Sequence, residues 1–388
     1  MAPDPALLIV DDNEDNRYTL IQRLKRQGYA NVTTAVNGRE ALDRLHAQPF
    51  DLVLLDVTMP EMNGYEVLEH VRADSRLRHV PVIMISAVDQ IESVVRCIEL
   101  GAEDYLPKPF NPTLLKARVG ASLEKKRLRD ELEAHVARIE AELDSARLIQ
   151  LSMVPCNFPA PTVETPVSIF ASLYPARQVG GDLYDFFYIS PTKLCVVVAD
   201  ISGKGAAAAL FMARTKTLAR TLSILLRSNA DTPEPHEVVT RMNAELCEDN
   251  PYSMFSTVFL ATIDLVNREL HYCSCGHPRP YVVSADGVSE LQSPRAAPLG
   301  IRPTFAYETT KRPLRVGDCL FLFTDGVTEA MDENDEQFSE ARLEEVLRSV
   351  AAGSTQSVVT SVVEAVRRFA GHAPQSDDIA ALAVRLVG

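Results

Sequence analysis

The sequence predicts an α/β protein in which a doubly wound parallel sheet is followed by a connecting helix and a second, mixed α/β domain. Over the first 120 residues, short apolar runs alternate with amphipathic helical stretches, as in a parallel sheet covered by helices. A long helical stretch with one apolar stripe comes next, and alternating strands with two long helices fill the remainder. A chain of 388 residues has room for about two to three domains. We therefore divide the chain into residues 1–120, 121–155 and 156–388.

In the first segment, short apolar runs mark the expected strands. They are Leu7–Val10, Val32–Val36, Leu52–Leu55, Val82–Ile85 and Tyr105–Leu106. Amphipathic stretches such as "EDNRYTLIQRLKRQG", closed by Gly28, mark the helices between them. Functional groups of such folds lie at the carboxyl ends of the strands. The polar residues found at or just after these ends are Asp11, Asp12, Asp56, Ser86 and Lys108.

The composition excludes several classes of protein. A net charge of −14 argues against nucleic acid as the main partner, because contact with phosphates needs a basic face. No apolar run approaches the ~18 residues of a membrane span, and the N-terminus lacks the basic region of a signal peptide. The cysteines number seven and are scattered, which fits a reducing cytoplasm better than a disulfide framework.

The middle segment, residues 121–155, predicts a helix with a partner. Its apolar residues recur at spacings of three and four, and no proline interrupts it before Pro155. The stripe consists of Leu128, Leu132, Val136, Ile139, Leu143 and Ala146. We expect a coiled coil that makes the protein a homodimer. The alternative is a helix packed on its own domain.

The polar residues of the first segment predict a magnesium site and a phosphoacceptor. Converging acids at strand ends form an oxygen site for a hard divalent ion. With the ion holding phosphoryl oxygens, Asp56 would attack phosphorus and become an aspartyl phosphate. Lys108 would pair with the new charge, and the Ser86 hydroxyl would form a hydrogen bond to it. The alternative is that these acids merely cap helices.

This segment resembles the receiver domain of bacterial response regulators. The matching stretches are "VDDNEDNR", "LVLLDVTMPEMNGYE", "VIMISA" and "GAEDYLPKPF". The resemblance implies a flavodoxin-like fold and phosphorylation of Asp56 by a sensor histidine kinase. It also implies Mg²⁺ at Asp11, Asp12 and the backbone carbonyl of Thr58. Ser86 and Tyr105, together with Lys108, would form the switch that reports phosphorylation.

Acids also recur next to glycines or apolar strands in the third segment. Asp182 lies in "ARQVGGDLYDF", Asp200 in "VVVADISGKG", Asp325 in "LFLFTDGVTEA", and Asp377 and Asp378 in "SDDIAALAV". Carboxylates from separate strands, without nearby histidine or cysteine, suit Mg²⁺ or Mn²⁺ rather than zinc. Two such ions would acidify a bridging water and clamp a phosphoryl group for in-line attack.

The glycine-rich turn "DISGKGAAA" does not match a nucleotide-binding loop. A phosphate loop of the Walker type needs G-x-x-x-x-G-K-[ST]. The glycine spacing here is too short, and Gly205 follows Lys204 where that motif has serine or threonine. We expect instead that Asp200 ligates a metal and that the tight turn brings the carbonyl of Ile201 to the same ion.

The third segment resembles the metal-dependent protein phosphatases, and most closely the bacterial branch that controls sporulation and general stress responses. The carriers are "PARQVGGDLYDF", "ADISGKGAAAAL", "STVFLATID", "CGHPRP", "PLG", "LFTDGVTEA" and "DDIAAL". The resemblance implies an α/β sandwich with two central antiparallel sheets. It also implies two Mn²⁺ or Mg²⁺ ions and hydrolysis of phosphoserine or phosphothreonine. The implied ligands are Asp182, Asp200, Ile201 through its carbonyl, Asp325, Asp377 and Asp378, with Asp185 as a further candidate.

The resemblance also implies a substrate and a control helix. Relatives of this branch dephosphorylate a serine on small anti-anti-sigma proteins, and "SARLIQLSMVP" is similar to their regulatory helix. The expected protein is thus a response regulator with a phosphatase as its output. One alternative is a non-catalytic module that sequesters a signalling partner when Asp56 is phosphorylated. Another is catalysis directed at a phosphorylated small molecule.

The stretch "LHYCSCGHPRP" carries two further patterns. Cys273 and Arg279 have the spacing of cysteine-dependent phosphatases, but Pro278 offers no N–H to a phosphate loop. His271, Cys273, Cys275 and His277 alternate along one strand, a spacing that does not easily wrap a tetrahedral zinc ion. Packing of this strand face into the core is the expected role.

Overall fold

The computed structural model describes residues 4–87, 91–227 and 232–387. The chain divides into two compact units, residues 1–139 and 140–388, and each is described by itself.

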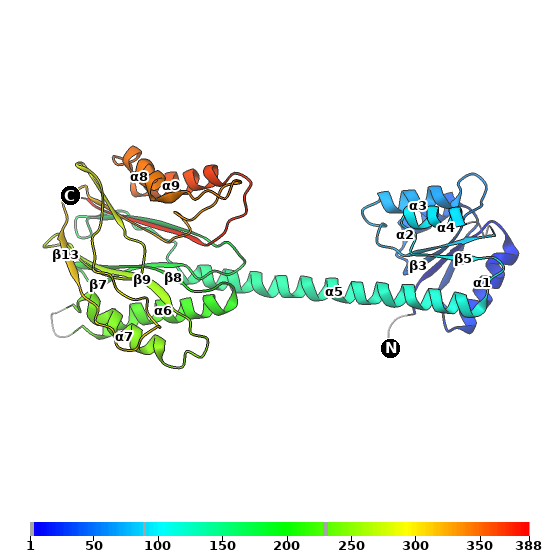
Figure 1. The fold of residues 1–388 in the computed structure, drawn as a ribbon, viewed down its shortest axis with the longest axis horizontal. Coiled ribbons are helices and arrows are strands. Elements are labelled where there is room, and N and C mark those ends of the chain that lie inside the picture. The colour runs from blue at the N-terminus through cyan, green and yellow to red at the C-terminus, as the bar shows by residue number, and fades with distance from the viewer. Residues whose placement is uncertain (1–3, 88–90, 228–231, 388) are drawn as a thin grey trace. The chain divides into compact units, whose positions relative to one another are not determined.

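The first unit is built on a parallel sheet with strand order β2-β1-β3-β4-β5 (Figure 1). This is the doubly wound order expected from the alternating pattern, with the chain reversing direction beside β1. The strands are β1 (Leu7–Val10), β2 (Val32–Ala35), β3 (Leu52–Asp56), β4 (Val82–Ser86) and β5 (Asp104–Pro107). The residues of β1, β3 and β4 are all buried, because helices cover both faces of the sheet, whereas the edge strands β2 and β5 are partly exposed.

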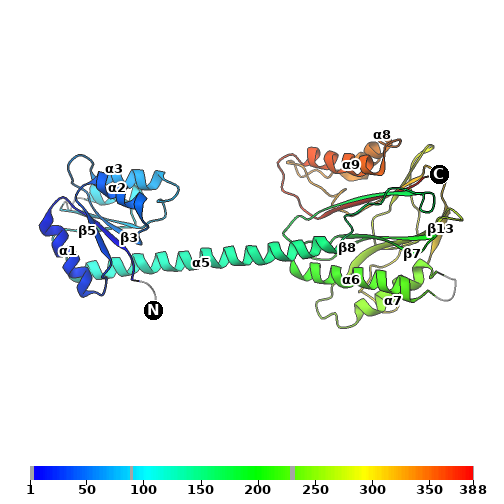
Figure 2. The same cartoon turned by 180° about the vertical axis from the view of Figure 1, so that it is seen from behind.

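Helices α1 to α5 supply this cover (Figures 1 and 2). One face packs against α1 (Glu14–Arg26) and the start of α5 (Pro112–Met153), the other against α2 (Gly38–Ala47), α3 (Gly64–Ala73) and α4 (Ile91–Glu99). Asparagine side chains accept hydrogen bonds from backbone N–H groups at the starts of α1, α2 and α3. These caps satisfy otherwise unpaired donors and fix the turns that follow β1 and β3.

Helix α5 is one continuous element of 42 residues. It begins within the first segment and continues through most of the helix expected over residues 121–155. Leu115 and Val119 pack in the core of the first unit. Further along, Leu128, Leu132, Val136 and Ile139 are 47 to 64% exposed. These four residues therefore do not pack on their own domain, contrary to the alternative above.

The second unit contains two antiparallel sheets, as expected. One has strand order β13-β10-β9-β8-β7 and the other β12-β11-β14-β15-β6. Their strands are β6 (Val167–Tyr174), β7 (Leu183–Ser190), β8 (Lys193–Ile201), β9 (Ser256–Asp264), β10 (Glu269–Cys275), β11 (Tyr281–Ser284), β12 (Gly287–Glu290), β13 (Thr310–Pro313), β14 (Cys319–Phe323) and β15 (Ile379–Leu386). A central core of alternating residues such as Val196, Phe259 and Leu382 holds the two sheets face to face.

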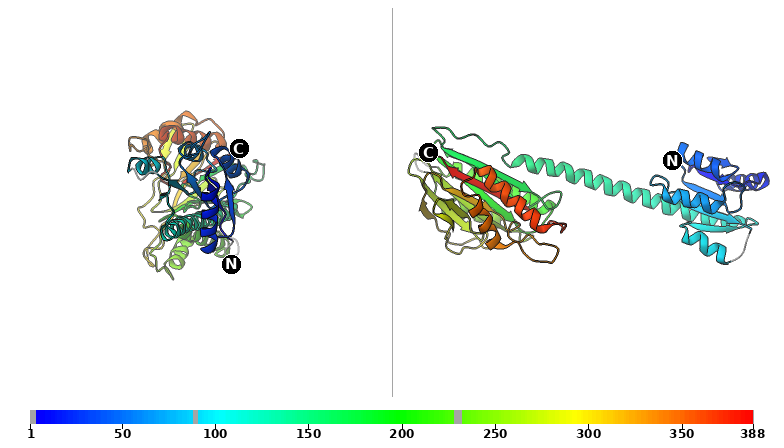
Figure 3. Two further views of the ribbon diagram at one scale, coloured as in Figure 1. Left: turned by 90° about the vertical axis from the view of Figure 1, so that its right-hand side faces the viewer. Right: turned by 90° about the horizontal axis from the view of Figure 1, so that it is seen from above.

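Two helix pairs close the outer faces of this sandwich (Figures 1 and 3). Helices α6 (Ala206–Leu225) and α7 (Pro235–Cys247) pack on the sheet that contains β8. Helices α8 (Ser339–Ser349) and α9 (Thr355–Ala370) pack on the sheet that contains β15. Throughout the described ranges, no helix combines the length and the apolar character needed to cross a bilayer.

Candidate functional sites

The first site lies at the carboxyl ends of β1 and β3. These strands are neighbours in the sheet, so the residues that follow them converge. Asp11, Asp12 and Asp56 each place a carboxylate oxygen within 4.8 Å of the others. Among the described residues they are the only group of three or more acids or metal-binding side chains that meets this criterion. Asp11 and Asp56 are buried and Asp12 is exposed, which leaves the site accessible from one side.

Lys108, just after β5, binds two of these acids. Its Nζ lies 2.8 Å from Asp56 Oδ2 and 2.9 Å from Asp11 Oδ2. Burial raises the pKa of Asp56, with the nearby Asp11 adding to the effect and Lys108 opposing it. Although burial works against it, the pKa of Lys108 is raised by its hydrogen bonds to Asp56 and Asp11. A charged lysine therefore faces the carboxylate expected to accept the phosphoryl group.

The expected switch residues lie on the two strands next to β3 on one side of the sheet. Ser86 is the last residue of β4 and Tyr105 lies in β5, and both are buried. Thr58 is exposed, and its backbone N–H donates a hydrogen bond to Asp56. The structure thus places Thr58 beside the acids, where its carbonyl was expected to serve as a metal ligand.

The second site lies at one end of the two-sheet sandwich. Asp182 directly precedes β7, and Asp200 is the next-to-last residue of β8, the antiparallel neighbour of β7. Asp325 follows the end of β14, and Asp377 precedes β15, which pairs with β14. Each antiparallel pair therefore delivers one acid from the end of a strand and one from the start of its neighbour, so these acids gather from four strands.

The acids of this second site perturb one another strongly. Burial raises the pKa of Asp182 well above its usual range, and the carboxylates of Asp200 and Asp378 raise it further. Burial and the nearby Asp325 and Asp377 raise the pKa of Asp200 to about 7. Such a cluster is stable in its charged form only when cations compensate it.

The oxygen donors of this second cluster suit a divalent metal, although no three of its carboxylates, all of which the structure describes, meet the 4.8 Å criterion that the first site meets. Asp182 Oδ2 is buried and forms no hydrogen bond within the described ranges, so it is an unused oxygen ligand inside the cluster. Asp182, Asp200, Asp325 and Asp377 offer hard oxygen donors, as Mg²⁺ and Mn²⁺ require. The carbonyl of Ile201 closes β8 at the same place, and a Cβ on Gly181 would lie 2.8 Å from it. The donor set is therefore suited to hard divalent ions.

Asp378 holds the backbone around this cluster. Its Oδ1 accepts a hydrogen bond from the N–H of Ala176 at 2.7 Å, and its Oδ2 accepts one from Gly181 at 2.6 Å. A Cβ on Gly180 would lie 2.1 Å from Asp378 Oδ2, and one on Gly326 would lie 1.9 Å from the Asp378 carbonyl oxygen. Glycine is thus required at both positions so that the backbone can approach Asp378.

The protein families whose sequence models match this chain decide to which family it belongs. The family described as Stage II sporulation protein E (SpoIIE) matches residues 190–387, about half of the chain. The response regulator receiver domain family matches residues 7–120. The chain belongs to the SpoIIE family and begins with a receiver domain. Residues 190–387 include Asp200, Asp325, Asp377 and Asp378, whereas Asp182 lies just before them.

Known proteins resemble each part of this SpoIIE-family chain. The chemotaxis protein CheY of Pseudomonas aeruginosa is 35% identical over 119 residues, 31% of this chain and 96% of that protein. The structure of the RsbU and RsbW domains of a Mycobacterium tuberculosis protein matches with 25% identity and a TM-score of 0.50, over 57% of this chain and 60% of that one.

The fold of the C-terminal domain has a further match in a solved structure. The SiaA-PP2C domain of Pseudomonas aeruginosa matches with a TM-score of 0.56 and 22% identity, over 65% of this chain and 98% of that one. The C-terminal part is therefore a domain of the SpoIIE family with the PP2C fold. The chain spans less than half the length of the first curated relatives that it matches.

Sequence reasoning missed two residues of the SpoIIE-type site. Lys204 Nζ lies 3.1 Å from Asp377 Oδ2 and 2.6 Å from the Ser376 carbonyl oxygen. Burial raises the pKa of Asp325, and the charge of Lys204 partly opposes this rise. Gln150, buried in the last turn of α5, donates to the Gly180 carbonyl at 2.5 Å and accepts from the Gly180 N–H at 3.0 Å. The stretches "DISGKG" and "LIQLS", which contain these two residues, were recognised in the sequence. No local pattern, however, predicts hydrogen-bond partners that lie so far away along the chain.

The structure also gives Asp185 a structural role. Its carboxylate is buried and forms ion pairs with Lys216 at 2.9 Å and Arg220 at 2.7 Å, both on α6. Both carboxylate oxygens are engaged in these pairs. Asp185 therefore fastens α6 to β7, and we do not count it among the residues that hold metal.

The raised pKa values of Asp182 and Asp200 predict that stabilisation of the C-terminal domain by metal depends on pH. Since the folded, metal-free domain holds protons on Asp182 and Asp200 that the unfolded chain releases, its stability falls as pH rises from about 4 toward 7. Mn²⁺ bound at these acids would replace those protons. We expect the rise in Tm on adding Mn²⁺ to be larger at about pH 8 than at about pH 5.5.

Calorimetry measures these Tm shifts. The chain used carries Asp11→Asn, so that Mn²⁺ binding at the receiver site does not contribute to the shift. The Asp325→Asn substitution in the same background should shrink the Mn²⁺ effect at the higher pH. Equal Tm shifts at both pH values would show that protons and metal do not compete for these acids.

Proposed function

We propose that this protein is a response regulator whose output is a protein serine/threonine phosphatase. A sensor histidine kinase would phosphorylate Asp56, with Mg²⁺ held by Asp11, Asp12 and the Thr58 carbonyl. The C-terminal domain would hydrolyse phosphoserine or phosphothreonine on a partner protein with two Mn²⁺ or Mg²⁺ ions. The observation that carries this proposal is the presence, in one chain, of two separate carboxylate clusters joined by helix α5.

The residues of the phosphatase site have distinct tasks. Two bound ions would polarise the phosphoryl group and acidify an attacking water. Asp182, Asp200, Asp325, Asp377 and the Ile201 carbonyl would hold them, and we keep Asp378 as a further candidate ligand. Through its hydrogen bonds to backbone N–H groups, Asp378 also fixes the loop that carries Asp182. Lys204 neutralises part of the charge of Asp377.

In the receiver, Lys108 holds the Asp56 carboxylate in place through a direct ion pair. After phosphorylation the same ammonium would bind a phosphoryl oxygen, and the Ser86 hydroxyl would donate to another. Tyr105, buried in β5, would move with Ser86 as the switch. The receiver helix at the start of α5, which packs through Leu115 and Val119, would carry the change into the connecting helix.

The substrate and the cellular setting follow from the same proposal. The SpoIIE and RsbU relatives favour a phosphoserine on an anti-anti-sigma protein as substrate, and thereby control of sigma-factor activity. The exposed stripe of Leu128, Leu132, Val136 and Ile139 favours a homodimer through α5, because the spacing of four, four and three is that of a coiled coil. Free cysteines throughout the described ranges favour the cytoplasm.

Coupling between the two domains should depend on Gln150. Its two hydrogen bonds connect the last turn of α5 to Gly180, two residues before Asp182. We expect Gln150→Ala to lower kcat by about 10- to 100-fold, as losses of residues that orient metal ligands do. We also expect it to make the remaining activity insensitive to phosphorylation of Asp56.

The matched control is Ser152→Ala in the same turn, since among the described residues the Ser152 hydroxyl donates a hydrogen bond only to the carbonyl of Ile149 within the helix. The measurement is aryl phosphate turnover by the full chain before and after phosphorylation. A Gln150→Ala chain that responds to phosphorylation like the wild type would remove this residue from the coupling path.

A further inference from the structure

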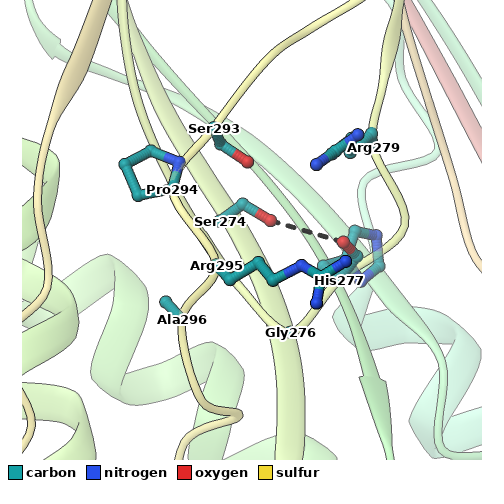
Figure 4. A pocket seen from close by; sticks show the side chains of 8 residues that line it. All are labelled: Ser274, Gly276, His277, Arg279, Ser293, Pro294, Arg295 and Ala296. Carbon is teal, nitrogen blue, oxygen red and sulfur yellow. Dashed lines mark hydrogen bonds between the residues drawn. The ribbon is translucent and has the colours of Figure 1, made fainter.

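A pocket of about 310 Å³ lies beside the phosphatase site and has no role in the mechanism above. Figure 4 shows two arginines, Arg279 and Arg295, that come from separate loops of the chain. The guanidinium of Arg279 and the hydroxyls of Ser274 and Ser293 point toward the same space, and the side chain of Arg295 runs along its side. The remaining lining residues are Gly276, His277, Pro294 and Ala296.

The pocket lies at the same end of the sandwich as the carboxylate cluster. Asp200 near the end of β8 is paired with Thr257 at the start of β9, so their side chains lie on the same sheet face. The Thr257 hydroxyl forms a 2.9 Å hydrogen bond with His277 Nδ1, and His277 lines the pocket. Thr257, the strand partner of Asp200, therefore contacts the wall of the pocket directly through His277.

The positive charge of the pocket comes from the two arginines alone. Arg295 forms no ion pair or hydrogen bond in the part of the chain that the structure describes. Arg279 Nη1 lies 3.1 Å from Glu290 Oε2, but both side chains are more than a third exposed, so water competes with this pair. His277 adds no charge, because burial lowers its pKa to about 3. The pocket thus offers at least one free guanidinium, with serine hydroxyls beside it.

We propose that Arg279 and Arg295 bind an acidic side chain of the protein substrate, close in sequence to its phosphorylated serine. This inference rests on the proposed function and adds a specificity for acidic flanking residues. Guanidinium groups form two parallel hydrogen bonds with a carboxylate, which gives both charge and geometric selection. An acidic segment would otherwise be repelled, because the chain carries a net charge of −14 and gathers carboxylates at this site.

Three phosphoserine peptides test the proposal on the full chain with Mn²⁺. They differ only in the residues flanking the phosphoserine, which are aspartate, asparagine or lysine. For the wild type we expect kcat/KM with aspartate to exceed that with asparagine by about tenfold, as charge-assisted hydrogen bonds would give. Arg295→Ala should reduce this ratio, and the Arg279→Ala/Arg295→Ala double variant should bring it close to one. The loss should appear in KM, because the arginines contribute to binding of the ground state as much as of the transition state.

Two further variants sharpen the test. Arg302→Ala removes an exposed arginine that lies outside the pocket and should keep the wild-type ratio. Arg295→Glu should shift the preference toward the lysine peptide, because it repels the aspartates. Each ratio compares the kcat/KM of two peptides measured with the same protein preparation. Partial unfolding of a variant lowers both values equally and does not alter their ratio.

The outcomes separate this inference from the function on which it rests. Turnover of an aryl phosphate and of all three peptides, with a ratio that the double variant leaves unchanged, would overturn the role of the two arginines and leave the phosphatase standing. Absence of turnover with every substrate would overturn the proposed function and this inference with it. A ratio that falls in the arginine variants and not in Arg302→Ala supports the inference.

Discussion

The Asp182→Asn substitution is expected to abolish the phosphatase activity, with kcat/KM falling by about 10³-fold or more. Asp182 is buried, and its Oδ2 has no hydrogen-bond partner in the described residues, so this oxygen is free to bind a cation. Asparagine keeps the size of the side chain and removes the negative charge. The fold should survive, because the substitution also relieves the repulsion by Asp200 and Asp378 that raises the pKa of Asp182.

Turnover of an aryl phosphate by the full chain measures this effect. Asp286→Asn is the matched control, since it removes the same charge from an exposed turn where Asp286 pairs with Arg315. The control should keep wild-type activity. An active Asp182→Asn chain would mean that the cluster around Asp182 is not the catalytic metal site.

The second large effect is expected from Gly180→Ala. The added Cβ would lie 2.1 Å from Asp378 Oδ2, a distance that no real contact allows, so the Asp378 carboxylate must move. That carboxylate accepts hydrogen bonds from the N–H groups of Ala176 and Gly181, and Gly180 itself is bonded to Gln150. We expect a loss of about 10²-fold in kcat/KM through displacement of Asp182. Overpacking should also cost about 1–3 kcal/mol of unfolding free energy.

Gly120→Ala is the matched control for this change. Gly120 lies inside α5, and a Cβ there meets no atom within 4 Å. Alanine should be neutral or stabilise the chain by about 0.5–1 kcal/mol, because it favours the helix. Activity and thermal unfolding of both variants check the pair. If Gly180→Ala behaves like Gly120→Ala, the loop around Asp182 is more adaptable than the contacts with Asp378 indicate.

The strand-end acids were predictable from sequence because strand ends are local features. Apolar runs ending in Asp56, Asp200 and Asp325 could be recognised, and the order of the sheets then brought these residues together. The strand boundaries in the receiver agree with the structure to within one residue at either end. The sequence predicted a connecting helix over residues 121–155 and did not say where it would start within the preceding receiver helix. In the structure it continues from the receiver, since Gly120 lies in open space and a single glycine does not end a helix.

The residues that organise the phosphatase site were not predictable in this way. Gln150 lies 30 positions from its partner Gly180, and Lys204 lies 172 positions from Ser376. Such contacts depend on how the two sheets and the last turn of α5 are packed. The role of Asp378 has the same origin, because its backbone partner Gly181 lies 197 positions away. Sequence pattern identified Asp378 as part of the site, and the structure showed which atoms it holds.

The proposed coupling of the two domains is that phosphorylation of Asp56 controls a metal-dependent phosphatase in the same chain. It is tested most directly by nitrophenol release from an aryl phosphate by the full chain, with Mn²⁺ or with chelator, before and after treatment with a small phosphodonor. We expect turnover that requires metal and changes on phosphorylation in the wild type but not in an Asp56→Ala chain. Metal-dependent turnover that ignores both phosphorylation and the Asp56→Ala substitution would contradict the coupling of the two domains. No turnover in any state would contradict catalysis itself and favour a module that captures its partner without hydrolysing it.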